Sequence, residues 1–400
     1  MDASDVLDLI GRDRPLFFGD AAAYADAIHD AICGRRVLVV GGAGSIGSEV
    51  VRQIFRQSPA ALHVIDVSEN NLVELVRDLR STLGYIEGET RFLPLDAGSV
   101  EAATFIAHQR PYNLVLNLAA LKHVRSEKDE FSLMRMVKVN VLDSLTILGW
   151  ARSMDAEKYF AVSTDKATNP ANLMGATKRI MEDGIFRWES GTRVSTARFA
   201  NVAFSDGSLL HAFRQRFARR QPISAPTDVR RYFVTGEESG LLCLLSLVVG
   251  NQGEIFFPKL DSTTHLLTFS AIACRLLEAR GFEPIELSTE DEARGRAEEL
   301  IERGKWPVYF FRTDTSGEKP VEEFYTEEDE VDWSRFDDIG VSRSRTLSPQ
   351  HCERVESFVA EVERLRRRGD WDKAELVHLI QVACPELAHV ETGSSLDERM

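Results

Sequence analysis

The chain has 400 residues, of which 44% are hydrophobic and 8% aromatic, a composition typical of globular proteins with two or three structural units. The formal net charge of −15 argues against nucleic acid as a partner. No apolar run reaches the ~20 residues of a membrane-spanning helix, and the acidic N-terminus lacks the basic region of a secretory signal. The five scattered cysteines show no metal-ligand spacing, so we expect free thiols in a reducing cytoplasm and no metal site.

Regular alternation of strand and helix patterns dominates residues 35–203. The strands are expected at residues 36–41, 61–66, 90–96, 113–119, 158–164 and 193–202. Helical patterns of about 10 to 15 residues separate them. This alternation predicts a Rossmann-like, doubly wound parallel sheet of the α/β class, an architecture that often binds dinucleotides. Residues 1–34 are expected to form a helical N-terminal extension.

The alternation weakens after residue 203. Residues 204–340 are expected to form a smaller α/β substrate-binding lobe, with the alternative that parts of this range return to the first domain. The apolar stretch at 239–250 is too short for a membrane span and is interpreted as a buried helix. The charged tail at 341–400 is expected to be a helical C-terminal extension.

A long helix is expected over residues 131–154. An apolar stripe follows one face of it, with the members Leu133, Met136, Val137, Leu145 and Leu148. A stripe at helical spacing is either part of the core or the face of a partner helix. We favour core as the interpretation.

A glycine-rich turn directly follows the first strand. Gly41, Gly44 and Gly47 form a GxxGxxG pattern that opens a helix, with Ser45 and Ile46 inside it. Glycine allows a tight turn and the close approach of a pyrophosphate, which then lies on backbone amides at the helix N-terminus. The pattern and its flanking elements therefore predict a dinucleotide-binding site.

Residues at the ends of other strands extend this predicted site. Asp66 ends the second strand 19 residues after Gly47, where a carboxylate binds the adenosine ribose hydroxyls and repels a 2′-phosphate. No lysine or arginine follows Asp66 at once, so we favour NAD over NADP. Asp96, which ends the third strand, is a candidate for the adenine amino group. Ala119 and Ala120, where the fourth strand ends, are expected to line the cofactor site.

Several stretches of the sequence carry a family resemblance. They read "GGAGSIGSE", "DVSENNL", "NLAALKHV", "VNV", "STDKATNPANLMGATKR", "RFANV", "RRYFVT" and "GEKPVEE". The combination of "STDKA" with "LMGATKR" is specific to a single branch of one superfamily, whereas the glycine pattern alone is shared by many dinucleotide-binding proteins. On these motifs the chain resembles the extended short-chain dehydrogenase/reductase superfamily. Within it, the chain is most similar to the polysaccharide-biosynthesis branch of nucleotide-sugar 4,6-dehydratases acting on UDP-N-acetylglucosamine.

The resemblance implies an NAD-dependent reaction in three steps. NAD⁺ takes a hydride from C4 of the hexose, water is lost across C5 and C6, and the hydride returns to C6, so the tightly bound cofactor is regenerated. The resemblance also implies a homodimer or higher homo-oligomer whose small-molecule partner is a nucleotide sugar.

The stretch "STDKATNPANLMGATKR" would carry the proton chemistry. The resemblance assigns the C4 oxygen contact to Thr164, the C6 acid to Asp165 and the C5 base to Lys166. Lys178 would bind the nicotinamide ribose, and Met174 stands four residues before it, where a sugar-nucleotide dehydrogenase carries a tyrosine. Asp165 must then be protonated and Lys166 neutral. Their ordinary pKa values are about 3.9 and 10.4, so both must be shifted by their surroundings.

Four further residues are candidates for contacts around the substrate. Lys122 and His123 follow the fourth strand and could reach the nicotinamide or the substrate, although a structural histidine is the favoured interpretation of His123. Asn140 in "VNV" and Asn201 in "RFANV" are either structural polar groups or orient the active site and the substrate phosphates.

The arginine-rich run at 214–231 is either a solvated face or an anion site. Within it, Arg231 is the candidate for the diphosphate, and Glu318 is the candidate for the nucleotide ribose. Related sequences often read RPGEK where this chain has "TSGEK", with Arg312 nearby, and FGNVLGSRGS where it has "FANVAFSDGS". These departures leave GDP open as the nucleotide.

Other functions remain as alternatives. A C5-inverting dehydratase or a nucleotide-sugar 4-epimerase could use the same fold, although Met174 argues against an epimerase that relies on tyrosine. A nucleotide-sensing or scaffold protein with a degenerate site is the non-enzymatic alternative. Thr164, Asp165, Lys166 and Lys178 argue against it, because a degenerate site would not need them all.

Overall fold

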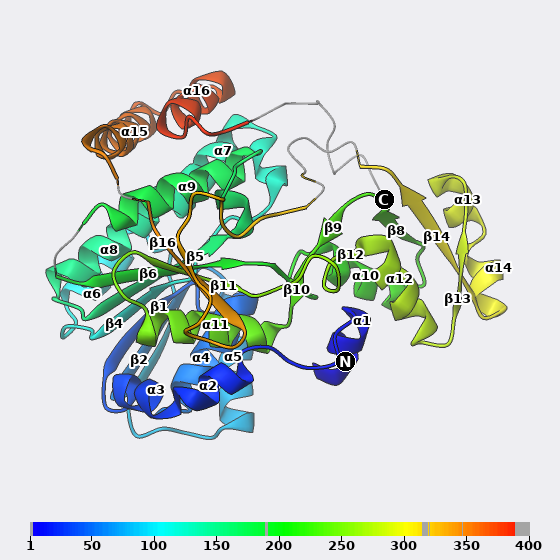
Figure 1. The fold of residues 1–400 in the computed structure, drawn as a ribbon, viewed down its shortest axis with the longest axis horizontal. Coiled ribbons are helices and arrows are strands. Elements are labelled where there is room, and N and C mark those ends of the chain that lie inside the picture. Colours follow the sequence, from blue (N-terminus) through cyan, green and yellow to red (C-terminus); the bar gives the residue numbers. More distant parts are fainter. Residues whose placement is uncertain (1–2, 189–190, 314–318, 320, 346, 389–400) are drawn as a thin grey trace.

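The computed structural model describes residues 3–188, 191–313, 319, 321–345 and 347–388. Within this part of the chain a nine-stranded sheet forms the centre of the molecule (Figure 1). Its spatial order is β15 (Val331–Asp332), β16 (Ile339–Arg343), β11 (Glu254–Pro258), β6 (Arg193–Phe199), β5 (Lys158–Thr164), β4 (Leu114–Asn117), β1 (Arg36–Val40), β2 (Ala61–Asp66) and β3 (Glu89–Pro94). Strands from β3 to β11 pair in parallel, whereas β16 and β15 pair antiparallel. The predicted Rossmann-like, doubly wound sheet is confirmed.

Helices cover both faces of this sheet, as Figure 1 shows. One face carries α4 (Ser45–Phe55), α5 (Glu69–Thr82) and α11 (Gly236–Val249), and the other carries α6 (Val100–Ala107), α8 (Asp143–Ser153) and α9 (Leu173–Phe186). In β1, Val37 and Val39 pack in the core beneath α4, α5 and α11, whereas Leu38 and Val40 pack in the core beneath α6, α8 and α9. Burial on both faces explains why β1 is a continuous apolar run in the sequence.

The helix expected over 131–154 is interrupted by a wider turn. It consists of α7 (Glu130–Val137), a π-helical turn (Lys138–Leu142) and α8. Such turns recur at functional sites, and this one contains Asn140. Along the apolar stripe, four side chains are buried and one is partly buried: Leu133, Met136, Val137 and Leu148, and then Leu145. The interpretation of the stripe as core is confirmed.

A smaller lobe adjoins the sheet, on the right in Figure 1. Its parallel sheet has the order β13 (Glu283–Glu286), β14 (Lys305–Phe311), β8 (Ile223–Pro226). Its helices are α10 (Leu209–Ala218), α12 (Phe269–Glu278), α13 (Glu290–Gly295) and α14 (Ala297–Glu302). Two short ribbons pair β7 (Asn201–Val202) with β10 (Phe233–Val234) and β9 (Arg230–Arg231) with β12 (Leu267–Thr268). Helix α11 packs on the main sheet, and β11 and β15 pair within it. The range 204–340 is therefore divided between the two lobes.

The N-terminal extension contacts both lobes. Helix α1 (Ala3–Leu9) packs on α12, while α2 (Phe18–Ala23) and α3 (Ala25–Ile32) pack on α11. Between them, Arg12 donates to the buried Glu238 carboxylate at 2.6 Å. Glu238 also accepts from the Thr235 amide in the capping box of α11. The extension therefore connects the small lobe to the main sheet through buried contacts.

The C-terminal extension forms a helical hairpin at the top of Figure 1. Helices α15 (Pro349–Arg368) and α16 (Lys373–Ala383) pack on each other and on α7 and α9. Phe358, Val362 and Ile380 from this hairpin share a core with Leu133 and Ile180. Across the described residues, no helix combines the length and the apolar character needed to cross a membrane.

Candidate active site

A cavity of about 420 Å³ lies where β1, β4, β5 and β6 end, with Phe233 and Phe269 of the small lobe in its wall. Ligands of doubly wound sheets bind at these carboxyl ends. The sequence-predicted residues that line it are Gly41, Gly44, Ser45, Ile46, Gly47, Ala120, Lys122, His123, Thr164, Asp165, Lys166, Met174, Lys178 and Asn201. The fold therefore brings the glycine-rich turn and the "STDKA" stretch to one cavity.

The glycine-rich turn leaves no room for side chains at two of its glycines. Gly41 has φ +75°, and a Cβ on it would lie 2.4 Å from the backbone nitrogen of Ala119. A Cβ on Gly47 would lie 2.1 Å from the Gly41 carbonyl oxygen. Gly44 is the N-cap residue of α4, so the turn leads directly into the N-terminus of this helix. Asp66 at the end of β2 accepts hydrogen bonds from Ala43 N and Ser68 N, both at 2.9 Å.

Four predicted site residues do not line the cavity, and a fifth lies outside the described residues. Asp96 pairs with Lys138 at 2.9 Å rather than lining the cavity. Asp66 and Ala119 lie directly behind the glycine-rich turn. Arg231 is 2% exposed and lies next to the cavity wall, 3.7 Å from Glu322. Glu318 falls outside the described residues.

The acid and the amine predicted to act on the sugar are in contact. Lys166 Nζ lies 3.3 Å from Asp165 Oδ1. The same carboxylate oxygen accepts from the Thr164 hydroxyl at 2.8 Å and from the Lys166 backbone amide at 2.9 Å. Asp165 is 2% exposed, so burial and three donors fix its position. A protonated carboxyl and a neutral amine held this way can exchange a proton directly.

The first turns of α9 carry Met174 and Lys178. Asn172 caps the helix by accepting from Gly175 N at 2.8 Å, and Met174 N donates to Glu127 Oε1 at 2.8 Å. Lys178 Nζ donates to the Val162 carbonyl at 3.0 Å. Burial lowers the pKa of Lys178 to about 8, with Glu182 acting in the opposite direction. Lys178 is thus a buried cation with a weakly compensated charge.

Asn140 in the π turn connects two walls of the cavity. Its Oδ1 accepts from Leu121 N at 2.9 Å, and its Nδ2 donates to Leu121 O and to Thr177 Oγ1, both at 3.0 Å. Leu121 precedes Lys122, and Thr177 precedes Lys178. The structure therefore gives Asn140 a scaffolding position behind the cavity rather than one in its lining.

The segment after β6 closes over the glycine-rich turn. The Asp206 backbone amide donates to Ser45 Oγ at 2.9 Å, and Ser45 Oγ lies 3.1 Å from Asp206 Oδ2. Lys122 Nζ donates to Ser205 Oγ at 3.3 Å. Burial against the cavity wall lowers the pKa of both Lys122 and His123, although both residues keep exposed surface.

Sequence reasoning missed two carboxylates of the site. Glu322 Oε1 lies 3.3 Å from Lys166 Nζ, and Glu127 holds the amide of Met174. Glu322 belongs to the quoted stretch "GEKPVEE", which was the available signal. Nothing local to that stretch identifies which of its glutamates reaches Lys166, because the contact joins distant parts of the chain.

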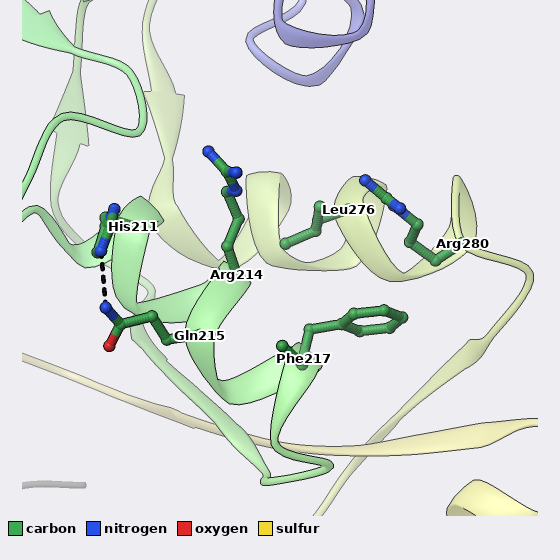
Figure 2. A pocket seen from close by; sticks show the side chains of 7 residues that line it. His211, Arg214, Gln215, Phe217, Leu276 and Arg280 are labelled. Atoms are coloured by element: carbon green, nitrogen blue, oxygen red, sulfur yellow. Dashed lines mark hydrogen bonds between the residues drawn. The ribbon is translucent and has the colours of Figure 1, made fainter. Parts of the chain in front are cut away.

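The arginine-rich run does not form one anion site. Arg231 lies beside Glu322, and Arg216 donates to Ser224 Oγ at 2.9 Å. Arg214 lines a separate cavity of about 330 Å³ between α10 and α12. Figure 2 shows this cavity, with Arg214 and Arg280 above Phe217 and with His211 bonded to Gln215. The run is therefore divided between the surface and the interior of the small lobe, with Arg214 exposed and Arg231 buried.

Comparisons with known proteins agree with this architecture. The chain is 30% identical over 280 residues to the capsular polysaccharide biosynthesis protein CapD of Staphylococcus aureus, covering 68% of this chain but only 45% of CapD. It is 28% identical over 239 residues to the UDP-N-acetylglucosamine 4,6-dehydratase (inverting) of Campylobacter jejuni, covering 57% of this chain and 68% of that protein. The solved structure of Pen from Bacillus thuringiensis has a TM-score of 0.62 at 20% identity, covering 78% of this chain and 89% of Pen.

The family model described as "Polysaccharide biosynthesis protein" matches residues 37–343. This range contains the main sheet from β1 to β16 and the whole small lobe. It leaves out the N-terminal extension and the α15–α16 hairpin. The match agrees with the motifs that carried the predicted resemblance, and the chain belongs to the polysaccharide biosynthesis protein family.

Proposed function

We propose that this protein is an NAD-dependent 4,6-dehydratase of a nucleotide-activated N-acetylhexosamine, with UDP-N-acetylglucosamine as the favoured substrate, in polysaccharide or amino-sugar biosynthesis. One observation carries the proposal. Asp165 and Lys166, an acid and an amine, lie 3.3 Å apart in the wall of the cavity that the glycine-rich turn also lines. The similarity to the dehydratase of Campylobacter jejuni supports the substrate class.

The glycine-rich turn fits a dinucleotide cofactor. Gly41 and Gly47 have no space for a Cβ, so the turn is tight enough for a pyrophosphate to lie on backbone amides at the start of α4. Bound there, the cofactor would supply the redox chemistry, taking hydrogen from C4 of the sugar and returning it to C6. Asp66 favours NAD, because its charge repels the 2′-phosphate of NADP. Lys178 is proposed to bind the nicotinamide ribose.

Thr164, Asp165 and Lys166 are proposed to handle the protons. Thr164 donates its hydroxyl proton to Asp165, so its oxygen can accept a hydrogen bond from the C4 hydroxyl. Lys166 takes the proton as the C5–H bond breaks, and Asp165 gives a proton to the C6 hydroxyl, which leaves as water. The proton released from the C4 hydroxyl during oxidation reaches Asp165 through Thr164, and this is the proton that Asp165 gives to the C6 hydroxyl. Once hydrogen has returned to C6, Lys166 gives its proton back to C5, so both residues are restored without an outside proton donor.

The experiment is an incubation of the purified protein with UDP- or GDP-N-acetylglucosamine in D₂O, followed by NMR. We expect a new C6 methyl group and deuterium at C5, because C5 is deprotonated and then reprotonated from exchanged groups. The configuration at C5 distinguishes retention from inversion, and the two sugars identify the nucleotide. An interconversion at C4 without a methyl group would indicate an epimerase instead. Absence of turnover with both sugars would refute the proposal.

A matched pair of variants tests the assignment of the acid. Asp165→Asn cannot donate the proton, so methyl formation should fall by about 10²- to 10⁴-fold. Asp291→Asn, on the exposed surface of α13 with a 92% exposed side chain, should keep wild-type turnover. Methyl formation at the wild-type rate in Asp165→Asn would contradict the role of Asp165.

A further inference from the structure

Glu322 lies beside Lys166, although far from it in the sequence. Its Oε1 lies 3.3 Å from Lys166 Nζ and 3.7 Å from Arg231 Nη2. Glu322 as a whole is only 3% exposed. Its second oxygen, Oε2, is buried and has no hydrogen-bond partner among the described residues. A buried carboxylate oxygen without a hydrogen bond lowers the stability of the fold, so its presence points to a function for the carboxylate.

The segment that carries Glu322 is fixed on both sides. Arg231 Nη1 donates to the Lys319 carbonyl at 2.9 Å, and Arg198 Nη1 donates to the Phe324 carbonyl at 2.8 Å. Arg198 is itself held by two hydrogen bonds to Glu182, at 3.0 and 2.8 Å. Two buried arginines thus clamp the backbone around Glu322. Its position beside Lys166 is therefore set by the fold.

Lys166 Nζ lies between two carboxylates, at 3.3 Å from Asp165 Oδ1 and 3.3 Å from Glu322 Oε1. The other charged groups that face Glu322 are Arg231 from β9 and Lys319 from its own segment. Burial raises the pKa of Glu322, while Lys166 lowers it and Asp165 raises it. The charge of Glu322 is therefore linked to the charge of Lys166.

We propose that Glu322 is a positioning residue that acts through Lys166: it holds the amine against Asp165 and stabilises the ammonium form of Lys166. This inference rests on the proposed function. When the C5–H bond breaks, its proton forms a new N–H bond on Lys166 and its electron pair stays with the sugar, forming the C5–C6 double bond as water leaves. Glu322 stabilises the positive charge that appears on Lys166 in this step.

The test measures the proton affinity of Lys166 without using substrate. Wild-type protein and variants are trace-labelled with acetic anhydride over a pH series, and the acetylated peptide that contains Lys166 is quantified by mass spectrometry. An opposite charge within a few ångströms shifts a pKa by about 1 to 3 units. In Glu322→Gln, the labelling midpoint of Lys166 should therefore fall by about one unit or more.

Two companion variants make the result specific. Glu322→Asp keeps the charge and should retain much of the wild-type midpoint. Glu323→Gln removes the neighbouring carboxylate, which bonds to Asn169 and is 55% exposed, and should leave the midpoint unchanged. A wild-type midpoint in a folded Glu322→Gln protein would overturn the proposal. If Glu322→Gln does not fold, Glu322→Met is labelled instead: a wild-type midpoint in that variant would overturn the proposal, and a fall of about one unit or more beside an unchanged Glu323→Gln would support it.

Turnover separates this inference from the proposed function. If the enzyme dehydrates the sugar, its rate should rise with pH as Lys166 loses its proton, and this rise should move to lower pH in Glu322→Gln with a reduced plateau. If wild-type protein turns over neither nucleotide sugar, the proposed function fails. The labelling midpoint still decides whether Glu322 controls the charge of Lys166.

Discussion

The end of β5 and the first turns of α9 both present a lysine to the same cavity, in opposite surroundings. Lys166 contacts Asp165 and Glu322, each at 3.3 Å. Lys178 bonds to the Val162 carbonyl and lies 3.8 Å from the sulfur of Met181, and burial lowers its pKa to about 8. Carboxylates compensate the positive charge of Lys166, whereas the charge of Lys178 is buried with little compensation and lowers the stability of the fold. The surroundings of Lys166 suit proton exchange, and those of Lys178 suit a fixed cation that binds a polar ligand.

The largest expected effect breaks the first of these regions. Lys166→Met removes the proposed C5 base, so dehydration should fall by about 10²- to 10⁴-fold. Binding of NAD should remain, because the glycine-rich turn and Lys178 are untouched. Product formation by NMR and cofactor titration by protein fluorescence measure the two properties separately. Turnover within about ten-fold of wild type would contradict the assignment of Lys166 as the base.

The second prediction concerns the cost of charge on Lys178. The folded-state pKa is about 8, against about 10.4 in an unfolded chain. The unfolded chain therefore binds more protons between these values, so wild-type stability rises over this pH window and is lowest below it. Lys178→Met removes the charge and should raise the free energy of unfolding at pH ~7 by up to about 3 kcal/mol. The gain should shrink towards pH ~10.

Urea unfolding at both pH values checks this prediction. Lys158, whose pKa is also lowered to about 8 by burial, is present in both proteins and cancels in the difference. Lys305→Met, at a lysine 41% exposed, is the control and should change stability by less than about 0.5 kcal/mol. A Lys178→Met protein that is less stable than wild type at pH ~7 would mean that the ammonium bond to Val162 outweighs the desolvation of the charge.

The difference between the two regions also explains what the sequence could predict. The doubly wound sheet followed from alternating patterns, because each strand and each crossover helix is a local segment. The gathering of the glycine-rich turn, Thr164, Asp165, Lys166 and Lys178 around one cavity followed too, since parallel strands end at the same edge of the sheet. Short-range patterns were therefore enough to locate this part of the cavity.

Contacts between residues far apart in the sequence could not be predicted from such local patterns. Glu322 reaches Lys166 only because Arg198 and Arg231 hold its segment, and both arginines are placed by tertiary packing. The packing of the helical extensions had no local signal either. Arg12 finds Glu238 on α11, and the α15–α16 hairpin finds α7 and α9. The charge of Lys166 thus depends on a residue that no motif spacing identifies.

The smallest expected effect sharpens the comparison with an exposed carboxylate. Asp206, whose side chain is 70% exposed, reaches Ser45 at the start of α4, where the proposed pyrophosphate would bind. Its negative charge opposes that ligand, but solvent screens it, unlike the buried charges around Lys166. Exposed charge interactions amount to about 0.2–1 kcal/mol. Asp206→Asn should therefore tighten NAD binding only by about two- to five-fold.

Cofactor titrations at low and high salt separate the charge of Asp206 from its hydrogen bond to Ser45. The gain in Asp206→Asn should disappear at ~1 M salt, where the Debye length is about 3 Å. Glu74→Gln, at a glutamate 72% exposed on α5, is the matched charge control and should bind NAD as wild type does. Weaker binding in Asp206→Asn would mean that the bond to Ser45 shapes the glycine-rich turn. In that case the carboxylate of Asp206 organises the cofactor half of the cavity, as those of Asp165 and Glu322 are proposed to organise the other.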